Sequence, residues 1–140
     1  MIEQRRLPPV FDTPLARWLA VAGWMALIFL LSSQSQLPSP PDPLADLIFK
    51  KGAHFTVYAV LAILFRRALP AGRWAWALPW VLTVFYAASD EWHQSFVPGR
   101  HPLFTDVLID ACGATTGLLL FWWHQRRTQA ATHSEDLAHR

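Results

Sequence analysis

The sequence predicts an all-α membrane protein, a bundle of four transmembrane helices with both termini on the cytoplasmic side. Three observations carry this prediction. Of the 140 residues, 53% are apolar and 16% are charged, which is too apolar for a typical small soluble domain. Four stretches are long and apolar enough to cross a bilayer. Lys and Arg are also distributed unevenly between the segments that join them.

The predicted single membrane domain covers residues 1–140 and divides into four spans and a cytoplasmic tail, at residues 15–33, 52–69, 74–93, 103–123 and 124–140. Each span needs about 20 mostly apolar residues, because every backbone amide must be satisfied within its own segment. The first span carries one charge, Arg17, near its start, and the second is the least apolar. Pro79 should kink the third span, and Asp106 and Asp110 lie in the first two turns of the fourth.

Basic residues set the expected orientation. The side that holds both termini has nine of them, at Arg5, Arg6, Arg17, Arg66, Arg67, Arg73, Arg126, Arg127 and Arg140. The other side has three, at Lys50, Lys51 and Arg100. The positive-inside rule therefore places both termini in the cytoplasm. A cleaved signal peptide is the alternative for the first span, and its removal would leave the other three spans with the same sidedness.

A proline-rich segment separates the first two predicted spans, with prolines at Pro38, Pro40, Pro41 and Pro43. Such a segment is extended and semi-rigid. A short interfacial helix is expected to follow it at residues 44–49, before the second span begins.

Polar residues recur at helical spacing on three of the spans. On the fourth, Asp106, Asp110, Gly113 and Gly117 follow at steps of four, three and four residues and so share one face, where the glycines allow another helix to approach closely. Two further stripes are expected at Lys51, His54 and Tyr58 and at Ala87, Glu91 and Gln94, with Asp90 turned about 100° away from the latter. All three stripes are expected at the same depth, near the outer surface of the membrane.

Two interpretations of these stripes stay open. They can form a latch that fixes the order of the helices, or a site that is open to the outside. For a site, the candidate binding residues are Lys51, Tyr58, Gln94, Arg100, Asp106 and Asp110, and Glu91 with His54 is a candidate general acid and base pair. Arg100 follows Pro98 and Gly99 in a predicted tight turn, where Gly99 can take a positive φ.

Other chemistries have weaker support in the sequence. A metal site has plausible ligand types in His54, Glu91, His93, Asp106 and Asp110, but no HxxxH or HExxH spacing, so neither a metal nor another cofactor is predicted. Ser89 and Ser95 near His93 lack the GxSxG turn of a serine nucleophile. Basic residues form only short pairs, which argues against nucleic-acid binding, and the single cysteine excludes a disulfide within the chain.

An ordered set of motifs resembles the VanZ-like family of bacterial integral membrane proteins. The set comprises SSQ at Ser32 to Gln34, KGAHFTVY with Lys51, His54 and Tyr58, then ExxQxFxPGR from Glu91 to Arg100, and finally Asp106, Gly113 and Gly117. Asp110 departs from the family pattern, which commonly has Asn there. The extra negative charge puts a neutral hydrogen-bonding role at this position in doubt.

The resemblance implies a four-span helical protein of the bacterial cytoplasmic membrane, in a family named for a member that lowers sensitivity to the glycopeptide teicoplanin. It implies no settled substrate or reaction. Three functions follow as hypotheses: binding of an outer-leaflet component such as a lipid-linked envelope precursor or a glycopeptide, a membrane enzyme that uses Glu91 and His54, and a structural module with a polar latch.

Overall fold

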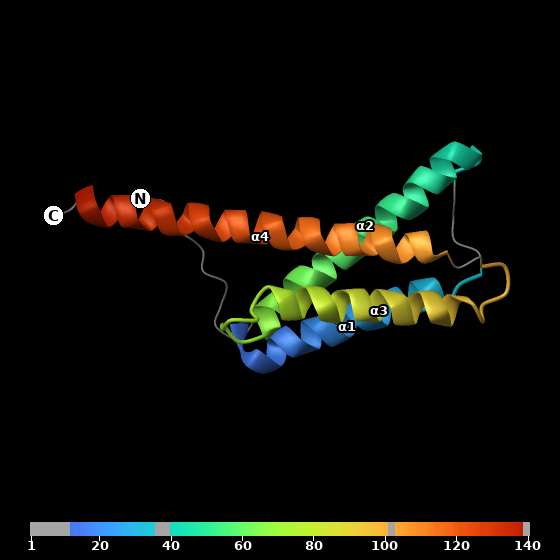
Figure 1. Cartoon of the computed structure of the whole chain (residues 1–140), viewed down its shortest axis with the longest axis horizontal. Helices are drawn as coiled ribbons and strands as arrows, with labels where there is room; N and C mark the ends of the chain where they lie inside the picture. The colour runs from blue at the N-terminus through green and yellow to red at the C-terminus, as the bar shows by residue number, and fades with distance from the viewer. Residues whose placement is uncertain (1–11, 36–39, 101–102, 139–140) are drawn as a thin grey trace.

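In the computed structural model, the described residues form four helices, which are α1 (Pro14–Ser32), α2 (Pro43–Ala68), α3 (Ala77–Gln94) and α4 (Phe104–Ala138) (Figure 1). The structure describes residues 12–35, 40–100 and 103–138, with side chains to residue 131, and these ranges contain no strand. The all-helical class is therefore confirmed. Four residues named in the sequence analysis lie outside these ranges, namely Arg5, Arg6, Pro38 and Arg140.

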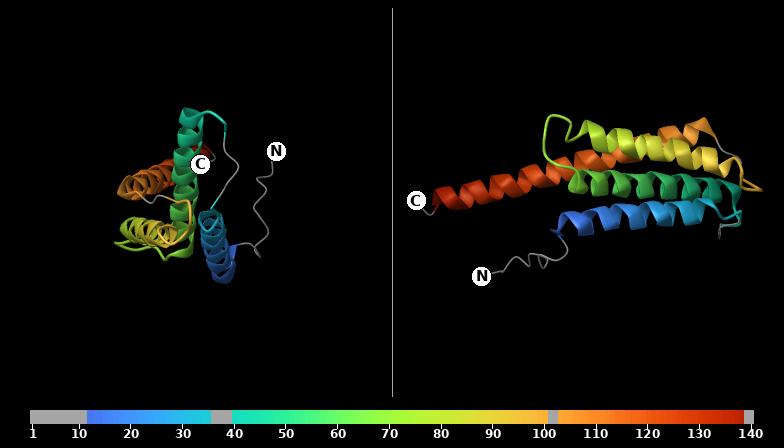
Figure 2. Two further views of the ribbon diagram at one scale, coloured as in Figure 1. Left: turned by 90° about the vertical axis from the view of Figure 1, so that its right-hand side faces the viewer. Right: turned by 90° about the horizontal axis from the view of Figure 1, so that it is seen from below.

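Consecutive helices run in opposite directions and pack side by side, and α4 extends beyond the other three (Figure 2). The start of α1 and the end of α2 meet at one end, where Arg17 Nη1 donates a hydrogen bond of 3.1 Å to the Arg67 carbonyl. We call this the arginine end, made of Arg17, Arg66, Arg67, Arg73, Arg126 and Arg127. The opposite end is called the polar end, made of Lys51, His54, Asp90, Glu91, Arg100, Asp106 and Asp110. Helix α2 contacts all three other helices.

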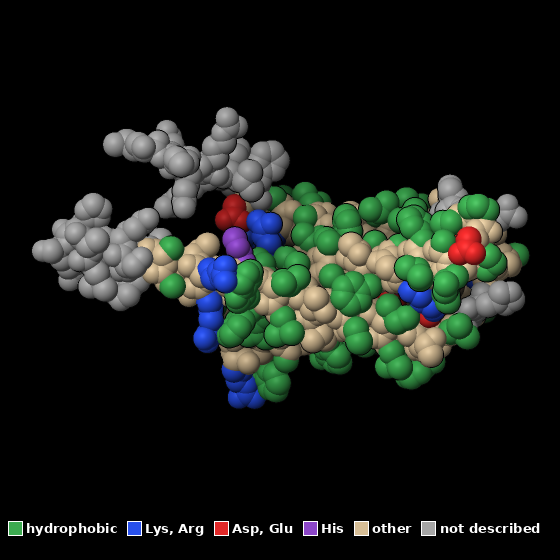
Figure 3. Space-filling model, turned by 90° about the horizontal axis from the view of Figure 1, so that it is seen from above, with side chains coloured by type: hydrophobic (Ala, Val, Ile, Leu, Met, Phe, Trp, Pro, Cys, Tyr) green, Lys and Arg blue, Asp and Glu red, His purple; other side chains and the backbone are tan. Residues whose placement is uncertain are grey.

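Three helices, α1, α2 and α4 as far as Ala131, are long and apolar enough to cross a membrane. Helix α3 does not meet this criterion, because its last two turns carry Asp90, Glu91, His93 and Gln94. The prediction that the second span is the least apolar was therefore wrong, since α2 meets the criterion and α3 does not. Much of the outer surface is apolar, as at Phe85, which is 74% exposed, and basic side chains lie towards its two ends (Figure 3). Exposed apolar side chains between charged ends are what a lipid environment requires, so the chain is a membrane protein.

Helix α2 begins earlier than the sequence predicts. A separate interfacial helix at residues 44–49 was expected, but α2 runs without a break from Pro43 through Gly52 to Ala68. Asp42 caps the start by accepting a 2.8 Å hydrogen bond from the Ala45 amide, and Pro43 occupies the first helical position, where it loses no hydrogen bond. The cap and the proline therefore set the start, and Gly52 alone does not break the helix.

The ends of α3 and α4 also differ from the predictions. Helix α3 begins at Ala77 instead of residue 74, so Pro79 lies in its first turn. The first four amides of a helix have no partner within it, so the argument for a kink at Pro79 was wrong. Helix α4 continues through most of the predicted tail to Ala138, because no Gly or Pro follows Gly117.

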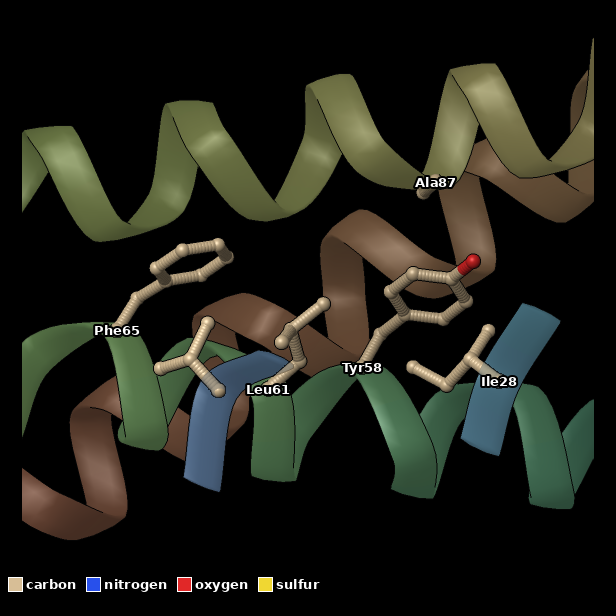
Figure 4. Packing of buried hydrophobic residues seen from close by; sticks show 6 residues of the cluster. Ile28, Tyr58, Leu61, Phe65 and Ala87 are labelled. Carbon is tan, nitrogen blue, oxygen red and sulfur yellow. The ribbon is translucent and has the colours of Figure 1, made fainter. Parts of the chain in front are cut away.

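The buried core centres on α2. Tyr58, Leu61 and Phe65 recur at helical spacing and are at most 6% exposed, and they pack against Ile28 of α1 and Ala87 of α3 (Figure 4). Lipid chains are as apolar as these side chains, so close packing and hydrogen bonds, rather than removal from water, hold the helices together. The Tyr58 ring is packed in this core while its hydroxyl points towards α3 (Figure 4).

Two glycines bring α4 against the backbone of α2. A Cβ atom added at Gly113 would overlap the Phe55 carbonyl, and one at Gly117 would overlap the Ala59 carbonyl. Both glycines are buried, one turn apart on the same face. The close approach of the two backbones thus depends on the missing side chains.

Candidate functional site

Two pairs of ionisable side chains join α2 to α4 at the polar end. Lys51 Nζ forms an ion pair with Asp106, and one turn further His54 Nδ1 lies 3.3 Å from Asp110 Oδ1. The Asp110 side chain is 1% exposed and that of Asp106 is 17% exposed. Both acids face α2 because they stand four residues apart on the same face of α4 as the two glycines.

Asp90 connects its own helix, α3, to α1 and α2 through a buried hydrogen-bond network. Its carboxylate accepts bonds from Ser32 Oγ of α1 at 2.6 Å, from the Tyr58 hydroxyl of α2 at 3.2 Å and from Gln94 Nε2 at 3.0 Å. The residue is 4% exposed, and no Lys, Arg or His among the described residues lies within 4.0 Å of its carboxylate. Three neutral donors therefore replace the water that burial removes.

The sequence analysis missed the central position of Asp90. It placed the inward face of this helix along Ala87, Glu91 and Gln94 and turned Asp90 away from it. In the structure Thr83, Ala87, Asp90 and Gln94 form one buried stripe at steps of four, three and four residues, and each is at most 4% exposed. That spacing was visible in the sequence, and following it back to Thr83 would have placed Asp90 on the inward face, although not its partners on α1 and α2.

Glu91 and His54 have separate partners. Glu91 Oε1 accepts a 2.8 Å hydrogen bond from the Leu103 amide, directly before α4 begins, whereas His54 faces Asp110. No hydrogen bond joins the two side chains, both of which lie within the described part of the chain. The contacts of Glu91 thus position the start of α4 and give no geometric support to an acid and base pair.

The turn after α3 places Arg100 over the end of α1. Gly99 has a φ of 82°, as the sequence predicts for this turn, and such a value favours glycine. Arg100 Nε donates to the Gln34 carbonyl at 3.0 Å, and Nη2 donates to the Leu31 carbonyl at 3.1 Å. The guanidinium thereby satisfies carbonyls that the end of a helix leaves without partners.

A cavity of about 100 Å³ lies between α1, α2 and this turn. Its walls are mostly apolar, and its polar lining is contributed by Ser32, Lys50, His54, Tyr58, Asp90 and Arg100. Apolar walls with a few convergent polar groups are typical of a site for a small or amphiphilic molecule. The polar end therefore divides into a latch-like contact between α2 and α4 and a cavity on the opposite side of α2.

Only some of the predicted site residues line the cavity, and His54 belongs to both parts. His54, Tyr58 and Arg100 line the cavity, whereas Lys51, Glu91, Gln94, Asp106 and Asp110 do not. The sequence analysis named Lys51 as a binding residue, but its neighbour Lys50 lines the cavity instead. Lys51 points towards Asp106, with which it forms an ion pair. Gln94 reaches the cavity only indirectly, through its hydrogen bond to Asp90.

The arrangement of the remaining polar residues offers little for other chemistries. Among the described residues, no three His, Cys, Asp or Glu side chains are grouped as a metal site needs. Ser89 and Ser95 each donate to a carbonyl of the preceding turn of α3, at 2.7 and 2.6 Å. Their hydroxyl groups are therefore engaged locally, as is common for serine in helices.

A sequence model of the VanZ/LLP1 family matches residues 17–125, which is most of the chain. The chain belongs to the VanZ/LLP1 family. This confirms the resemblance drawn from the motifs. No curated protein and no solved structure shows significant similarity to it. The part that matches the VanZ/LLP1 family begins in the first turn of α1 and contains the whole polar end, whereas α4 continues beyond it.

Proposed function

We propose that this VanZ/LLP1 protein lies in the bacterial cytoplasmic membrane with four spans, both termini in the cytoplasm and the polar end facing outward. Helix α3 has 18 residues, a length of about 27 Å at 1.5 Å per residue, which approaches the thickness of the hydrocarbon layer. It lies beside α2 and α4, and its Phe85 and Trp92 are exposed as lipid-facing side chains are. The excess of arginine at the opposite end supports the orientation.

A topology reporter tests this orientation. An enzyme that is active only in the cytoplasm, fused after Arg140, should be active, and the same enzyme inserted after Gly99 should be silent. Activity at Gly99 combined with silence at Arg140 would reverse the sidedness. Activity at both positions would mean that α3 and α4 do not cross the membrane as a pair.

We further propose that the polar end binds an amphiphilic component of the outer leaflet, such as a lipid-linked cell-wall precursor or a glycopeptide antibiotic. The cavity between α1 and α2 carries this proposal, because it combines apolar walls with the Arg100 guanidinium. Arg100 uses two donors on backbone carbonyls and has further N–H groups that can bind a phosphate or a carboxylate. Apolar residues such as Leu31 and Phe49 would hold the lipid portion.

Such binding would connect the protein to glycopeptide tolerance by a simple route. A protein that holds the precursor or the antibiotic at the outer leaflet lowers the concentration of free target or free drug there. No covalent step is required. A contribution to teicoplanin tolerance is therefore part of the proposal.

Binding can be measured with the full chain in lipid nanodiscs, using teicoplanin and a purified lipid-linked cell-wall precursor as separate probes. Ala53 lines the cavity and is exposed, so Ala53→Trp should block it and weaken binding of the true ligand about tenfold or more. Thr56→Trp is the matched control, because Thr56 is exposed on the same helix but outside the cavity. Equal affinities for both variants would overturn the cavity as the site.

The second candidate function is a structural module held together by the α2 to α4 latch. The pairs of Lys51 with Asp106 and of His54 with Asp110 favour it. Cells with and without the gene separate these functions through their lipids, cell-wall precursors and glycopeptide sensitivity. Altered sensitivity with unchanged lipids supports binding, and a changed headgroup would instead reveal an enzyme. No change in any of the three would leave the structural module.

A further inference from the structure

A second apolar recess lies at the arginine end, far from the polar cavity. It is a groove of about 670 Å³ between the start of α3 and the middle of α4. Its walls include Trp76, Trp80, Val81, Leu118, Leu119 and Trp122. The Trp80 indole N–H is already used, because it donates to Thr115 Oγ1 at 3.0 Å. The groove is thus almost wholly apolar, and its volume is large enough for part of a hydrocarbon chain.

Two arginines stand over the tryptophans that line this groove. The Arg66 guanidinium carbon lies 4.8 Å from the centre of the Trp76 ring, and that of Arg126 lies 4.3 Å from the centre of the Trp122 ring. Trp76 precedes α3 and Trp122 belongs to α4, so the two cations approach the groove from different walls. Stacking on a tryptophan holds the planar guanidinium in place and leaves its edge free to donate.

The described residues provide no carboxylate to balance the charge of these two arginines. Within the described part of the chain, no Asp or Glu lies within 4.0 Å of Arg66 or Arg126. Arg66 Nε is buried and has no hydrogen-bond partner there. A buried donor without a partner is costly, and the Arg66 guanidinium has neither a carboxylate nor a full set of hydrogen-bond partners within the described residues.

We propose that the groove between α3 and α4 binds one phospholipid with a net negative headgroup, in the leaflet that meets the arginine end. One acyl chain lies in the groove along Trp80 and Leu119, and the phosphate accepts hydrogen bonds from Arg66 and Arg126. Bidentate contact between guanidinium and phosphate provides the recognition. The site does not depend on the proposed function, because it uses different residues at the opposite end of the bundle.

The chemistry of the groove favours an anionic lipid over the other occupants. A zwitterionic headgroup carries a cation, and among the described residues no carboxylate lies within 4.0 Å of either arginine to receive it. An apolar helix from a second copy of the chain would fill the groove but would leave both guanidinium groups without an anion. Only a lipid that joins a hydrocarbon chain to an uncompensated phosphate matches both parts of the site.

Native mass spectrometry of the detergent-purified full chain tests the proposal with phosphatidylglycerol and phosphatidylcholine of equal chain length. Wild type should retain one phosphatidylglycerol, bound about tenfold or more tightly than phosphatidylcholine. Replacing both arginines, R66Q with R126Q, should remove most of that preference. The matched control is R73Q with R127Q, because Arg73 and Arg127 also stack on tryptophans, Trp74 and Trp123, that do not line the groove.

The control pair should change the preference less than about threefold, because the rings under Arg73 and Arg127 lie outside the groove lining and the two arginines would act only as general surface charges. Equal losses in the two double variants would reduce the site to a general basic belt and overturn it. A77W should also displace the lipid, since Ala77 lines the groove, whereas L78W should not. The assignment would also be wrong if inorganic phosphate alone displaced the bound lipid. It would be wrong too if A77W dissociated a dimer of the chain and left lipid binding unchanged.

Discussion

The two ends of the bundle hold their charges in different ways. At the polar end, Asp90 and Asp110 are at most 4% exposed, and each faces a side chain from another helix. At the arginine end, the cations lie over tryptophan rings, and Arg17 and Arg67 share the one described acid there, Asp12. Buried charges need specific partners, whereas interfacial arginines can use water and headgroups. The polar end should therefore be sensitive to substitution and the arginine end tolerant.

The largest effect is expected at the glycine contact that brings the polar ends of α2 and α4 together. Gly113→Ala places a methyl group against the Phe55 carbonyl, which cannot move without displacing α2. Overpacking of this kind costs about 3 kcal/mol of stability. The measurement is thermal stability in detergent, followed by size-exclusion chromatography after heating.

Gly23→Ala is the control for that change, because nothing lies within 4 Å of a Cβ atom at Gly23. It should leave stability unchanged or raise it by up to about 1 kcal/mol, since Ala is the better helix former. If both alanines had the same effect, the close approach of α2 and α4 would not matter to stability.

An intermediate effect is expected at the hydrogen-bond network of Asp90. Asp90→Ala removes the acceptor for Ser32, Tyr58 and Gln94 and leaves their donors buried, at a cost of about 2 kcal/mol. Arg127→Gln at the arginine end should change stability by less than about 0.5 kcal/mol, as surface substitutions do. Both variants can be compared in the same heating assay. An equal loss for the two would remove the difference between the ends.

The smallest effect is expected from the ion pairs at the start of α2. A double-mutant cycle on Lys51 and Asp106 should give a coupling of about 1 kcal/mol, because the pair is partly buried and joins two helices. The neighbouring pair of Lys50 and Asp46 lies within one helix with Lys50 46% exposed, and should give about 0.3 kcal/mol. A larger coupling for the second pair would mean that burial between helices does not strengthen the contact.

Sequence reasoning worked best where the signal was local. Gly99 was expected to take a positive φ in the PGR turn, and it does. The boundary errors were also local, because Asp42 with Pro43 was not recognised as a cap and Pro79 was assigned to a helix interior. Capping chemistry was visible in the sequence in the first case, so better use of it would have placed the start of α2 correctly.

The contacts at the polar end could not be predicted in the same way. Helical spacing identified Asp106 and Asp110 as one face, but it could not say that Lys51 pairs with one and His54 with the other. It also could not separate the cavity side of α2 from its latch side, because a polar stripe on a central helix has neighbours on both sides.

The sequence by itself determined that this protein is a helical membrane protein, where its charges lie along the chain and which family it belongs to. These properties depend on composition, on the period of the helix and on the order of motifs, all of which are local. Only the tertiary structure decided that Asp90 is the centre of a network, that Arg100 caps α1 and that two arginines border an apolar groove. Each of these depends on the distance between residues far apart in the chain, which the packing of α2 against its three neighbours sets.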